Sequence, residues 1–288
     1  PIARYRFIHD VIAPSIEAPK IILAYFYAGN DLLENALQVR ELFIPKYSQA
    51  SINDDKAWQD FFSDIIEKRK VGPFSGINSN KGWLPRATFK ILKRELKTKK
   101  VGEELGDIHI KQTGKVNTVW VNNKKIKIPD ALQSPAMTLN PEETNLGFLA
   151  FSQSLHYLRE SFPKSRVVVV YIPSVIESYN IASKKISISN IISKTKVYTE
   201  VRPSTELRQR SNEIASRVKT LSLAEGVNFI DTRADIWAAS VKQIIHGPID
   251  WKHFNRKGYE TLAQSIACSL EKQAITATSN NCKKEKVD

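Results

Sequence analysis

The stretch "KIILAYFYAGNDLLEN", residues 20–35, sets the fold class of this chain. Its run Ile21–Tyr27 is continuously apolar, rich in aromatic and branched side chains, and ends in Gly29-Asn30-Asp31. A strand that is apolar on both faces is typical of a parallel sheet covered by helices. Glycine, asparagine and aspartate then favour a turn. We therefore predict a buried strand that ends in a polar turn.

Two further apolar runs predict two more core strands. Val167–Ile172 reads "VVVVYI" and is stopped by Pro173, and Val227–Ile230 follows Gly226. Three core strands are few for 288 residues. Strands that alternate with helices nevertheless predict an α/β fold with a parallel sheet. In such sheets ligands bind at the carboxyl ends of the strands, which is where Asn30 lies.

Helical patterns separate these strands. Asn140-Pro141-Glu142-Glu143 predicts a helix start, because asparagine can cap, proline suits the first turn and Glu143 can reach back to the cap. A second helix is predicted near Ser204–Glu225, with a glycine as its stop. A third is predicted near the C-terminus, where Tyr259, Leu262, Ile266 and Leu270 form an apolar stripe.

The segment 46–139 is polar and basic, and we interpret it as an insertion or cap. Within it we expect a basic helix at Arg86–Lys100 and a hairpin in "VNTVWVNNKKIKI" that turns at Asn122-Asn123. The predicted organisation is therefore core at 1–45, insertion at 46–139, core again at 140–273 and a disordered tail at 274–288.

The charge of the chain is strongly positive and unevenly distributed. The formal net charge is +13, and residues 86–127 contain 12 Lys and Arg against 4 Asp and Glu. Such a patch attracts acidic glycans, anionic lipids or nucleic acid, although a plain solvated surface has the same composition. Nucleic acid is the least favoured partner, because only Trp83, just before the stretch, and Trp120, within it, are in plausible binding positions, and no nucleic-acid-binding module is present.

Several classes of protein are not indicated. No apolar run reaches the roughly 18–20 residues of a membrane helix, so we predict no transmembrane segment. Cys268 and Cys282 lack metal-ligand spacing, and we expect no metal site and no disulfide framework. Cys268 is expected to be a small core residue.

An acid and an imidazole stand three residues apart in "DWKHFNRKGYETLA", residues 250–263. Asp250 can hydrogen-bond to one nitrogen of His253 and leave the other free as a general base. Asn30 can donate a hydrogen bond to an oxyanion. Each motif alone is weak, because Asp-x-x-His is common by chance and Gly29-Asn30-Asp31 suits an ordinary turn.

Together, "KIILAYFYAGNDLLEN", "RVVVVYIPSVIESY", "GVNFIDTRADIW" and "DWKHFNRKGYETLAQSI" resemble, in order, the later part of an SGNH/GDSL hydrolase. The resemblance implies a three-layer α/β/α, flavodoxin-like fold, with 46–139 inserted between the third and fourth core strands. It implies that His253 is the general base, Asp250 the acid that orients it and Asn30 an oxyanion-hole donor. Gly29 would allow a tight turn, and Asp31 completes the motif. No metal or organic cofactor is implied.

The family's Gly-Asp-Ser motif, whose serine is the nucleophile, and its second, glycine motif are absent. In family order both would precede residue 1, and we expect them there. Ser15 and Ser174 are poor substitutes, because each would need a different geometry. The resemblance also implies that the Ile21–Tyr27 strand has an open apolar edge, a cause of poor solubility or of partner recruitment.

The expected activity is ester hydrolysis on an acylated small molecule, lipid or carbohydrate, possibly anionic. Two alternatives are O-acetyl transfer to an envelope polysaccharide and binding of a polyanion or glycan without catalysis. Trp251 can line the substrate cleft or pack under its loop, and His246 can line the cleft or have a structural or solvent-facing role. The resemblance makes a bacterial envelope or secreted location plausible, while the sequence itself leaves the location unknown.

Overall fold

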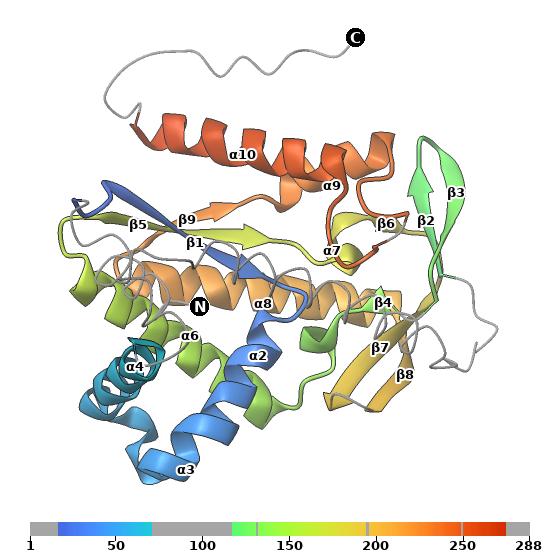
Figure 1. Ribbon diagram of the computed structural model, residues 1–288. Helices are drawn as coiled ribbons and strands as arrows, with labels where there is room; N and C mark the ends of the chain where they lie inside the picture. The colour runs from blue at the N-terminus through green and yellow to red at the C-terminus, as the bar shows by residue number, and fades with distance from the viewer. Residues whose placement is uncertain (1–16, 71–116, 131, 194–195, 249, 275–288) are drawn as a thin grey trace, which may run out of the picture.

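The computed structural model describes residues 17–70, 117–130, 132–193, 196–248 and 250–274. Within them the chain is a mixed α/β structure with a parallel sheet, so the predicted α/β class is confirmed (Figure 1). The predicted helix at Arg86–Lys100 lies outside the described residues, as does the predicted disordered tail apart from its first residue.

The parallel sheet consists of the three apolar runs of the sequence, in the order β1-β5-β9. β1 spans Ile21–Tyr27, β5 spans Arg166–Ile172 and β9 spans Asn228–Asp231. β5 pairs with both neighbours in parallel, so the carboxyl ends of all three strands meet at one edge of the sheet. All three predicted strands are confirmed, and their ends differ from the prediction by at most one residue.

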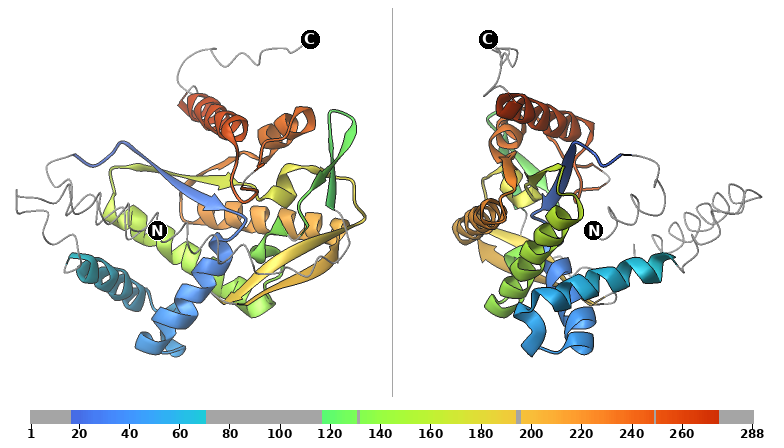
Figure 2. Two further views of the ribbon diagram at one scale, coloured as in Figure 1. Left: turned by 45° about the vertical axis from the view of Figure 1, so that its right-hand side comes forward. Right: turned by 90° about the vertical axis from the view of Figure 1, so that its left-hand side faces the viewer.

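Helices cover both faces of this sheet (Figures 1 and 2). α6 (Pro141–Ser161) and α8 (Ser204–Ala224) lie on one face. α9 (Arg233–Lys242) and α10 (Arg256–Ala274) lie on the other. Val168–Tyr171 of β5 are fully buried between these layers, which explains why the run is apolar on both faces.

The start of α6 follows the predicted capping box. The side chain of Asn140 accepts a hydrogen bond of 2.8 Å from the backbone N–H of Glu143, whose own side chain accepts one of 3.3 Å from the backbone N–H of Asn140. Further along, Phe151 of α6 meets Phe26 of β1 edge-to-face, with ring centres 5.1 Å apart. Phe26 also stacks on Tyr171 of β5 at 5.8 Å. These contacts dock α6 on the sheet.

A helical segment follows β1 and packs on α6 as a second apolar cluster. The segment comprises α2 (Asp31–Gln38), a π-helical turn (Val39–Phe43), α3 (Ile44–Tyr47), a 3-10 turn (Ala50–Asn53) and α4 (Asp55–Lys70). Phe43 stacks on Trp58 at 4.2 Å, and Phe62 meets Tyr157 of α6 at 4.7 Å. The predicted boundary between residues 45 and 46 therefore falls inside a helical segment.

The predicted hairpin is confirmed. β2 (Asn117–Val121) and β3 (Lys124–Ile128) pair antiparallel, and the short β6 (Asn180–Ile181) adds to β2. The two turn residues, Asn122 and Asn123, have φ angles of 49° and 58°. Asparagine tolerates this left-handed conformation better than most residues, which is why it occupies two-residue hairpin turns.

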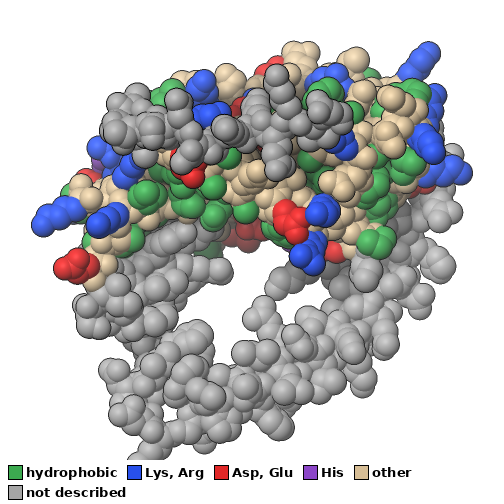
Figure 3. Space-filling view, turned by 90° about the horizontal axis from the view of Figure 1, so that it is seen from above, with side chains coloured by type: hydrophobic (Ala, Val, Ile, Leu, Met, Phe, Trp, Pro, Cys, Tyr) green, Lys and Arg blue, Asp and Glu red, His purple; other side chains and the backbone are tan. Residues whose placement is uncertain are grey.

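A third small sheet was not predicted. Its order is β4-β7-β8, formed by β4 (Leu132–Gln133), β7 (Lys185–Ser193) and β8 (Lys196–Pro203). Two short helical elements, a 3-10 turn at Pro135–Met137 and α7 (Val175–Ser178), complete the described chain. Seen from the side of α10, lysine and arginine side chains are spread around the described surface with hydrophobic side chains between them (Figure 3).

Two predictions from composition concern these described elements. Among them, no helix is both long enough and apolar enough to cross a membrane. Cys268 on α10 is half-buried and disulfide-bonded, so the prediction of a small core residue was wrong and the disulfide was not expected. A cysteine in a helical stripe has the same local pattern whether or not its sulfur is bonded.

Candidate functional site

The candidate site lies at the carboxyl edge of the parallel sheet. There β1 passes through Gly29 into α2, and the connection between α9 and α10, described at residues 243–248 and 250–255, reaches the same edge (Figure 1). The phenol of Tyr27 donates a hydrogen bond of 2.8 Å to the backbone carbonyl of Lys252. The structure thus brings together the two motifs that are more than 200 residues apart in the sequence.

Asp250 and His253 form the predicted pair. Nδ1 of His253 shares a short hydrogen bond with Oδ2 of Asp250, and the backbone N–H of Lys252 donates to the other carboxylate oxygen at 2.7 Å. Partial burial raises the pKa of Asp250, but the hydrogen bonds from His253 and Lys252 and their positive charges outweigh it and hold the pKa below its usual range. The acid therefore stays ionised at neutral pH.

The imidazole of this pair is open to solvent. The side chains of His253 and Asp250 are 63% and 48% exposed. Nε2 of His253 has no hydrogen-bond partner within the described part of the chain. An imidazole held at Nδ1 by a carboxylate and free at Nε2 can accept a proton from a hydroxyl group or from water.

Asn30 lies at the start of α2, half-buried, at the end of β1. Its side-chain nitrogen donates a hydrogen bond of 2.5 Å to Oε1 of Glu34, one turn along the helix. An amide nitrogen has two hydrogens, so this contact orients the group and leaves one donor for a ligand. Glu34 was not among the predicted site residues, although its spacing from Asn30 is one helical turn.

Asp31 has a defined contact that the sequence did not reveal. Its carboxylate accepts a hydrogen bond of 2.7 Å from the backbone N–H of Tyr27. Burial raises the pKa of Asp31 to about 6, against the lowering effect of this hydrogen bond and with a further increase from the nearby Glu34. Asp31 therefore satisfies a backbone donor at the end of β1.

Gly29 is required by a close approach. A Cβ atom on Gly29 would lie 2.3 Å from a ring carbon of Tyr27, which is far inside van der Waals contact. The carbonyl of Gly29 also accepts a hydrogen bond of 3.4 Å from the backbone N–H of Ala136. The predicted role of Gly29, a tight turn, is therefore accompanied by a second role, which is to make room for the ring of Tyr27.

His246 is a core residue. It is 1% exposed, its ring lies 4.6 Å from that of Phe254, and Nδ1 hydrogen-bonds to the phenol of Tyr179 at 3.1 Å. Burial lowers the pKa of His246 to about 3, with Asp250 opposing and His253 adding to this shift. Of the roles predicted for His246, the structural one is the role that these contacts support, because the side chain is enclosed under the loop and neutral.

Trp251 is half-buried and packs on the core beneath the loop. A Cβ atom on Gly247, which has a φ of 70°, would lie 2.7 Å from the indole ring. Of the two roles predicted for Trp251, packing under the loop is the one that these contacts support. Trp251 lies between Asp250 and His253 in the chain, so its packing against Gly247 anchors the loop that bears this pair.

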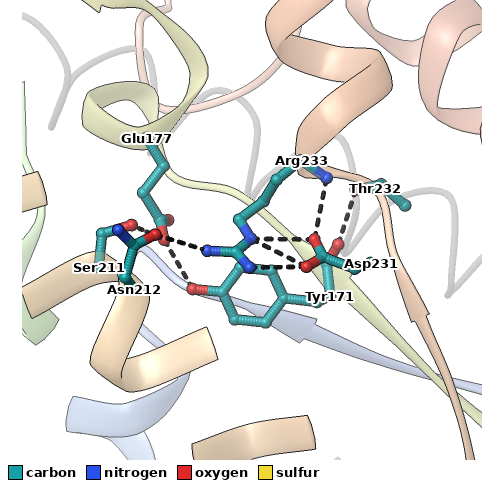
Figure 4. Close-up of polar contacts among 7 residues, drawn as sticks. All are labelled: Tyr171, Glu177, Ser211, Asn212, Asp231, Thr232 and Arg233. Atoms are coloured by element: carbon teal, nitrogen blue, oxygen red, sulfur yellow. Dashed lines mark hydrogen bonds and ion pairs between the residues drawn. The ribbon is translucent and has the colours of Figure 1, made fainter. Parts of the chain in front are cut away.

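A second polar cluster, which the sequence analysis missed, lies at the carboxyl ends of β5 and β9 (Figure 4). Glu177 accepts hydrogen bonds of 2.6 Å from the phenol of Tyr171, 2.5 Å from the hydroxyl of Ser211 and 2.6 Å from the backbone N–H of Ser174. Burial raises the pKa of Glu177, although these hydrogen bonds oppose it. Tyr171 also stacks on Phe26 of β1 at 5.8 Å, so the cluster lies beside β1.

Arg233 closes this cluster on the β9 side. Its guanidinium lies over the ring of Tyr171 at 5.4 Å, pairs with Asp231 at 2.7 Å and donates to Asn212 at 3.0 Å (Figure 4). Thr232 donates a hydrogen bond of 2.6 Å to the carbonyl of Tyr171. These contacts tie β5, α8 and β9 together, and no local sequence pattern indicated them.

No serine of the described chain makes a hydrogen bond to His253. Ser174 is fully buried beside Glu177, and Ser15 lies outside the described residues.

A groove of about 1100 Å³ runs along α8 and is lined by Arg208, Asn212 and Arg217, away from the Asp250–His253 pair. The described residues also contain no group of three or more His, Cys, Asp or Glu side chains that could hold a metal ion.

Comparison with known proteins gives no relative. No family model, no curated protein and no solved structure matches this chain.

Proposed function

We propose that this chain is part of a serine-dependent ester hydrolase of the SGNH/GDSL type. One observation supports the proposal above the others: the Asp250–His253 hydrogen bond lies in a loop that Tyr27 connects to the Gly29-Asn30-Asp31 turn. The parallel order β1-β5-β9, with helices on both faces, is compatible with the flavodoxin-like, three-layer fold that such enzymes have.

In this proposal His253 acts through Nε2. It removes the proton from a serine hydroxyl as the serine oxygen attacks the ester carbonyl, and later returns the proton to the leaving alcohol. Asp250 fixes the tautomer by accepting from Nδ1 and stabilises the imidazolium. The free amide hydrogen of Asn30 stabilises the oxyanion of the tetrahedral intermediate. Water then attacks the acyl-enzyme with His253 again as the base.

The serine itself is proposed to come from residues that precede Pro1 in the family order. The proposed substrate is an ester of a small molecule, a lipid or a carbohydrate. The net charge of +13 favours an anionic substrate among these.

The test uses the protein expressed from its whole reading frame, assayed with p-nitrophenyl acetate. His253→Ala should lower kcat by about 10³-fold or more, and Asn30→Ala by about 10²-fold. A fluorophosphonate probe should label one serine, located before Pro1. The matched control is His156→Ala, because His156 is 39% exposed on α6 and pairs with Glu160 and Glu225. This control should hydrolyse the ester at the wild-type rate.

The proposal is overturned if His253→Ala retains wild-type activity or if no serine is labelled. Two other outcomes identify the alternatives. A rate that grows with added de-acetylated polysaccharide indicates acetyl transfer to a glycan. Absence of ester hydrolysis together with polyanion binding that weakens steeply with salt indicates a binding protein.

A further inference from the structure

The loop that holds Asp250 and His253 is attached to the molecule at two sides. On the inner side, the phenol of Tyr179 accepts hydrogen bonds from the backbone N–H groups of Ile245 at 2.9 Å and of His246 at 3.0 Å. On the side of β1, the contact is the hydrogen bond from Tyr27 to the carbonyl of Lys252. Within the described residues, no other hydrogen bond joins the β1–α2 connection to this loop.

Both backbone groups of Lys252 are thereby occupied. Its N–H donates to Asp250 at 2.7 Å, and its carbonyl accepts from Tyr27 at 2.8 Å. That carbonyl belongs to the peptide bond that leads directly into His253. Because a peptide bond is planar and rigid, fixing its oxygen fixes the position from which the side chain of His253 starts.

Tyr27 is itself held on three sides. Its backbone N–H donates to Asp31, its ring lies against the bare Cα of Gly29, and its hydroxyl reaches Lys252. Burial raises the pKa of this phenol above its ordinary value, and the negative charges of Glu177, Asp31 and Asp250 raise it further. The phenol therefore remains a hydrogen-bond donor across the range in which enzymes work.

These contacts place Tyr27 in one continuous structure with the donor motif. Tyr27 stands three residues before Asn30. Between and beside them, Gly29 makes room for the ring of Tyr27, and Asp31 accepts the hydrogen bond from its backbone N–H. A hydrogen bond from Tyr27 thus sets the distance between the turn that bears Asn30 and the loop that bears His253. An active site requires such distances to be kept within about 0.5 Å.

We infer that Tyr27 is a positioning residue, which fixes the Asp250–His253 pair relative to Asn30, and that Gly29 and Asp31 serve it. The effect of Tyr27 on catalysis rests on the proposed function. The positioning itself, in which the hydroxyl of Tyr27 holds the imidazole of His253 in place, can be measured in a protein without activity.

The first experiment compares Tyr27→Phe with the wild type by NMR of the histidine rings. Loss of the hydroxyl should shift the ring signals of His253 and weaken or broaden the downfield signal of the Nδ1 proton. Tyr25→Phe is the matched control, because Tyr25 is 53% exposed on the same strand, two residues earlier. It should leave these signals unchanged. If Tyr27→Phe also leaves them unchanged while the protein is folded, the inference is wrong.

The second experiment measures kinetics in the active protein. Tyr27→Phe should lower kcat by about 10- to 100-fold with KM nearly unchanged, since a displacement of 1 Å has an effect of this size. Gly29→Ala should act in the same direction by displacing the ring. A kcat within twofold of the wild type for both variants would overturn the inference. Altered His253 signals in a protein without ester hydrolysis would refute the proposed function while supporting the positioning by Tyr27.

Discussion

The phenol of Tyr171 donates a 2.6 Å hydrogen bond to Glu177, and the two residues lie on either side of the point where β5 ends (Figure 4). The same carboxylate oxygen accepts from Ser211 of α8, and the other accepts from the backbone of Ser174. One half-buried acid thus joins a strand, the helix that packs beneath it and the short α7. Tyr171 in turn stacks on Phe26 of β1, so the cluster reaches the strand that supports the candidate site.

Glu177→Ala should destabilise the fold by about 3–5 kcal/mol, because three donors would lose their acceptor in the interior. Ser211→Ala should cost about 1 kcal/mol, since it removes one donor and leaves the acceptor with two others. Urea unfolding at neutral pH, followed by circular dichroism, measures both values.

Glu206→Ala provides the control for this prediction. Glu206 is a half-exposed acid on α8 that pairs with Arg202 at 2.8 Å, and its removal should change the unfolding free energy by less than about 1 kcal/mol. If Glu177→Ala and Glu206→Ala lowered the free energy of unfolding equally, the three hydrogen bonds to Glu177 would contribute no more to stability than one surface ion pair.

Local signals in the sequence predicted the elements of the sheet. Two strands were predictable because their residues are apolar on both faces, namely the runs at Ile21–Tyr27 and Val167–Ile172. The hairpin turn at Asn122-Asn123 was predictable because asparagine tolerates a positive φ. β7 was missed although "KISISNIIS", Lys185–Ser193, alternates apolar and polar residues. Such alternation is typical of a strand with one buried face, whereas Ile186–Ser189 of β7 are buried on both faces.

The candidate site was predictable only in part. The Asp250–His253 contact follows from a spacing of three residues, so the sequence contains it. The contact between Tyr27 and Lys252 joins residues 225 positions apart and depends on the tertiary fold. The burial of His246 could not be predicted either, because no local sequence pattern distinguishes an exposed histidine from one that, as here, is buried against Tyr179.

Asp31→Asn should stabilise the protein at alkaline pH. The folded state raises the pKa of Asp31 from 3.8 to about 6, so between these values it binds the proton more tightly than the unfolded chain does. The contribution of Asp31 to the free energy of unfolding therefore falls as pH rises through this range and stays low above it. At about pH 8 the variant should be more stable by roughly 1–3 kcal/mol, and at about pH 4 the two proteins should agree.

The asparagine keeps a side-chain oxygen that can still accept from Tyr27, so the comparison isolates the charge. The measurement is urea unfolding at both pH values. Asp60→Asn, on the exposed face of α4, is the control and should show no gain at alkaline pH. A variant of Asp31 that is less stable than the wild type at alkaline pH would mean that the ionised carboxylate is favoured in the folded state.

His246 should make the fold sensitive to acid. Its folded pKa of about 3 lies below the ordinary value of 6.5, so the unfolded chain takes up the proton first. The free energy of unfolding should therefore decrease as pH falls below about 6.5, by up to about 1.4 kcal/mol for each pH unit. His246→Asn offers Tyr179 an oxygen in place of Nδ1 and cannot titrate, so its stability should be lower at neutral pH but flatter between about pH 6.5 and pH 5.

Phe254→Leu separates packing from titration in this test. It removes the ring that lies 4.6 Å from that of His246 but keeps the imidazole, so it should lower stability at neutral pH and retain the steep acid dependence. Urea unfolding at several pH values distinguishes the two variants. A wild-type slope in His246→Asn would assign the acid sensitivity to other groups and would show that the buried imidazole can be protonated without unfolding.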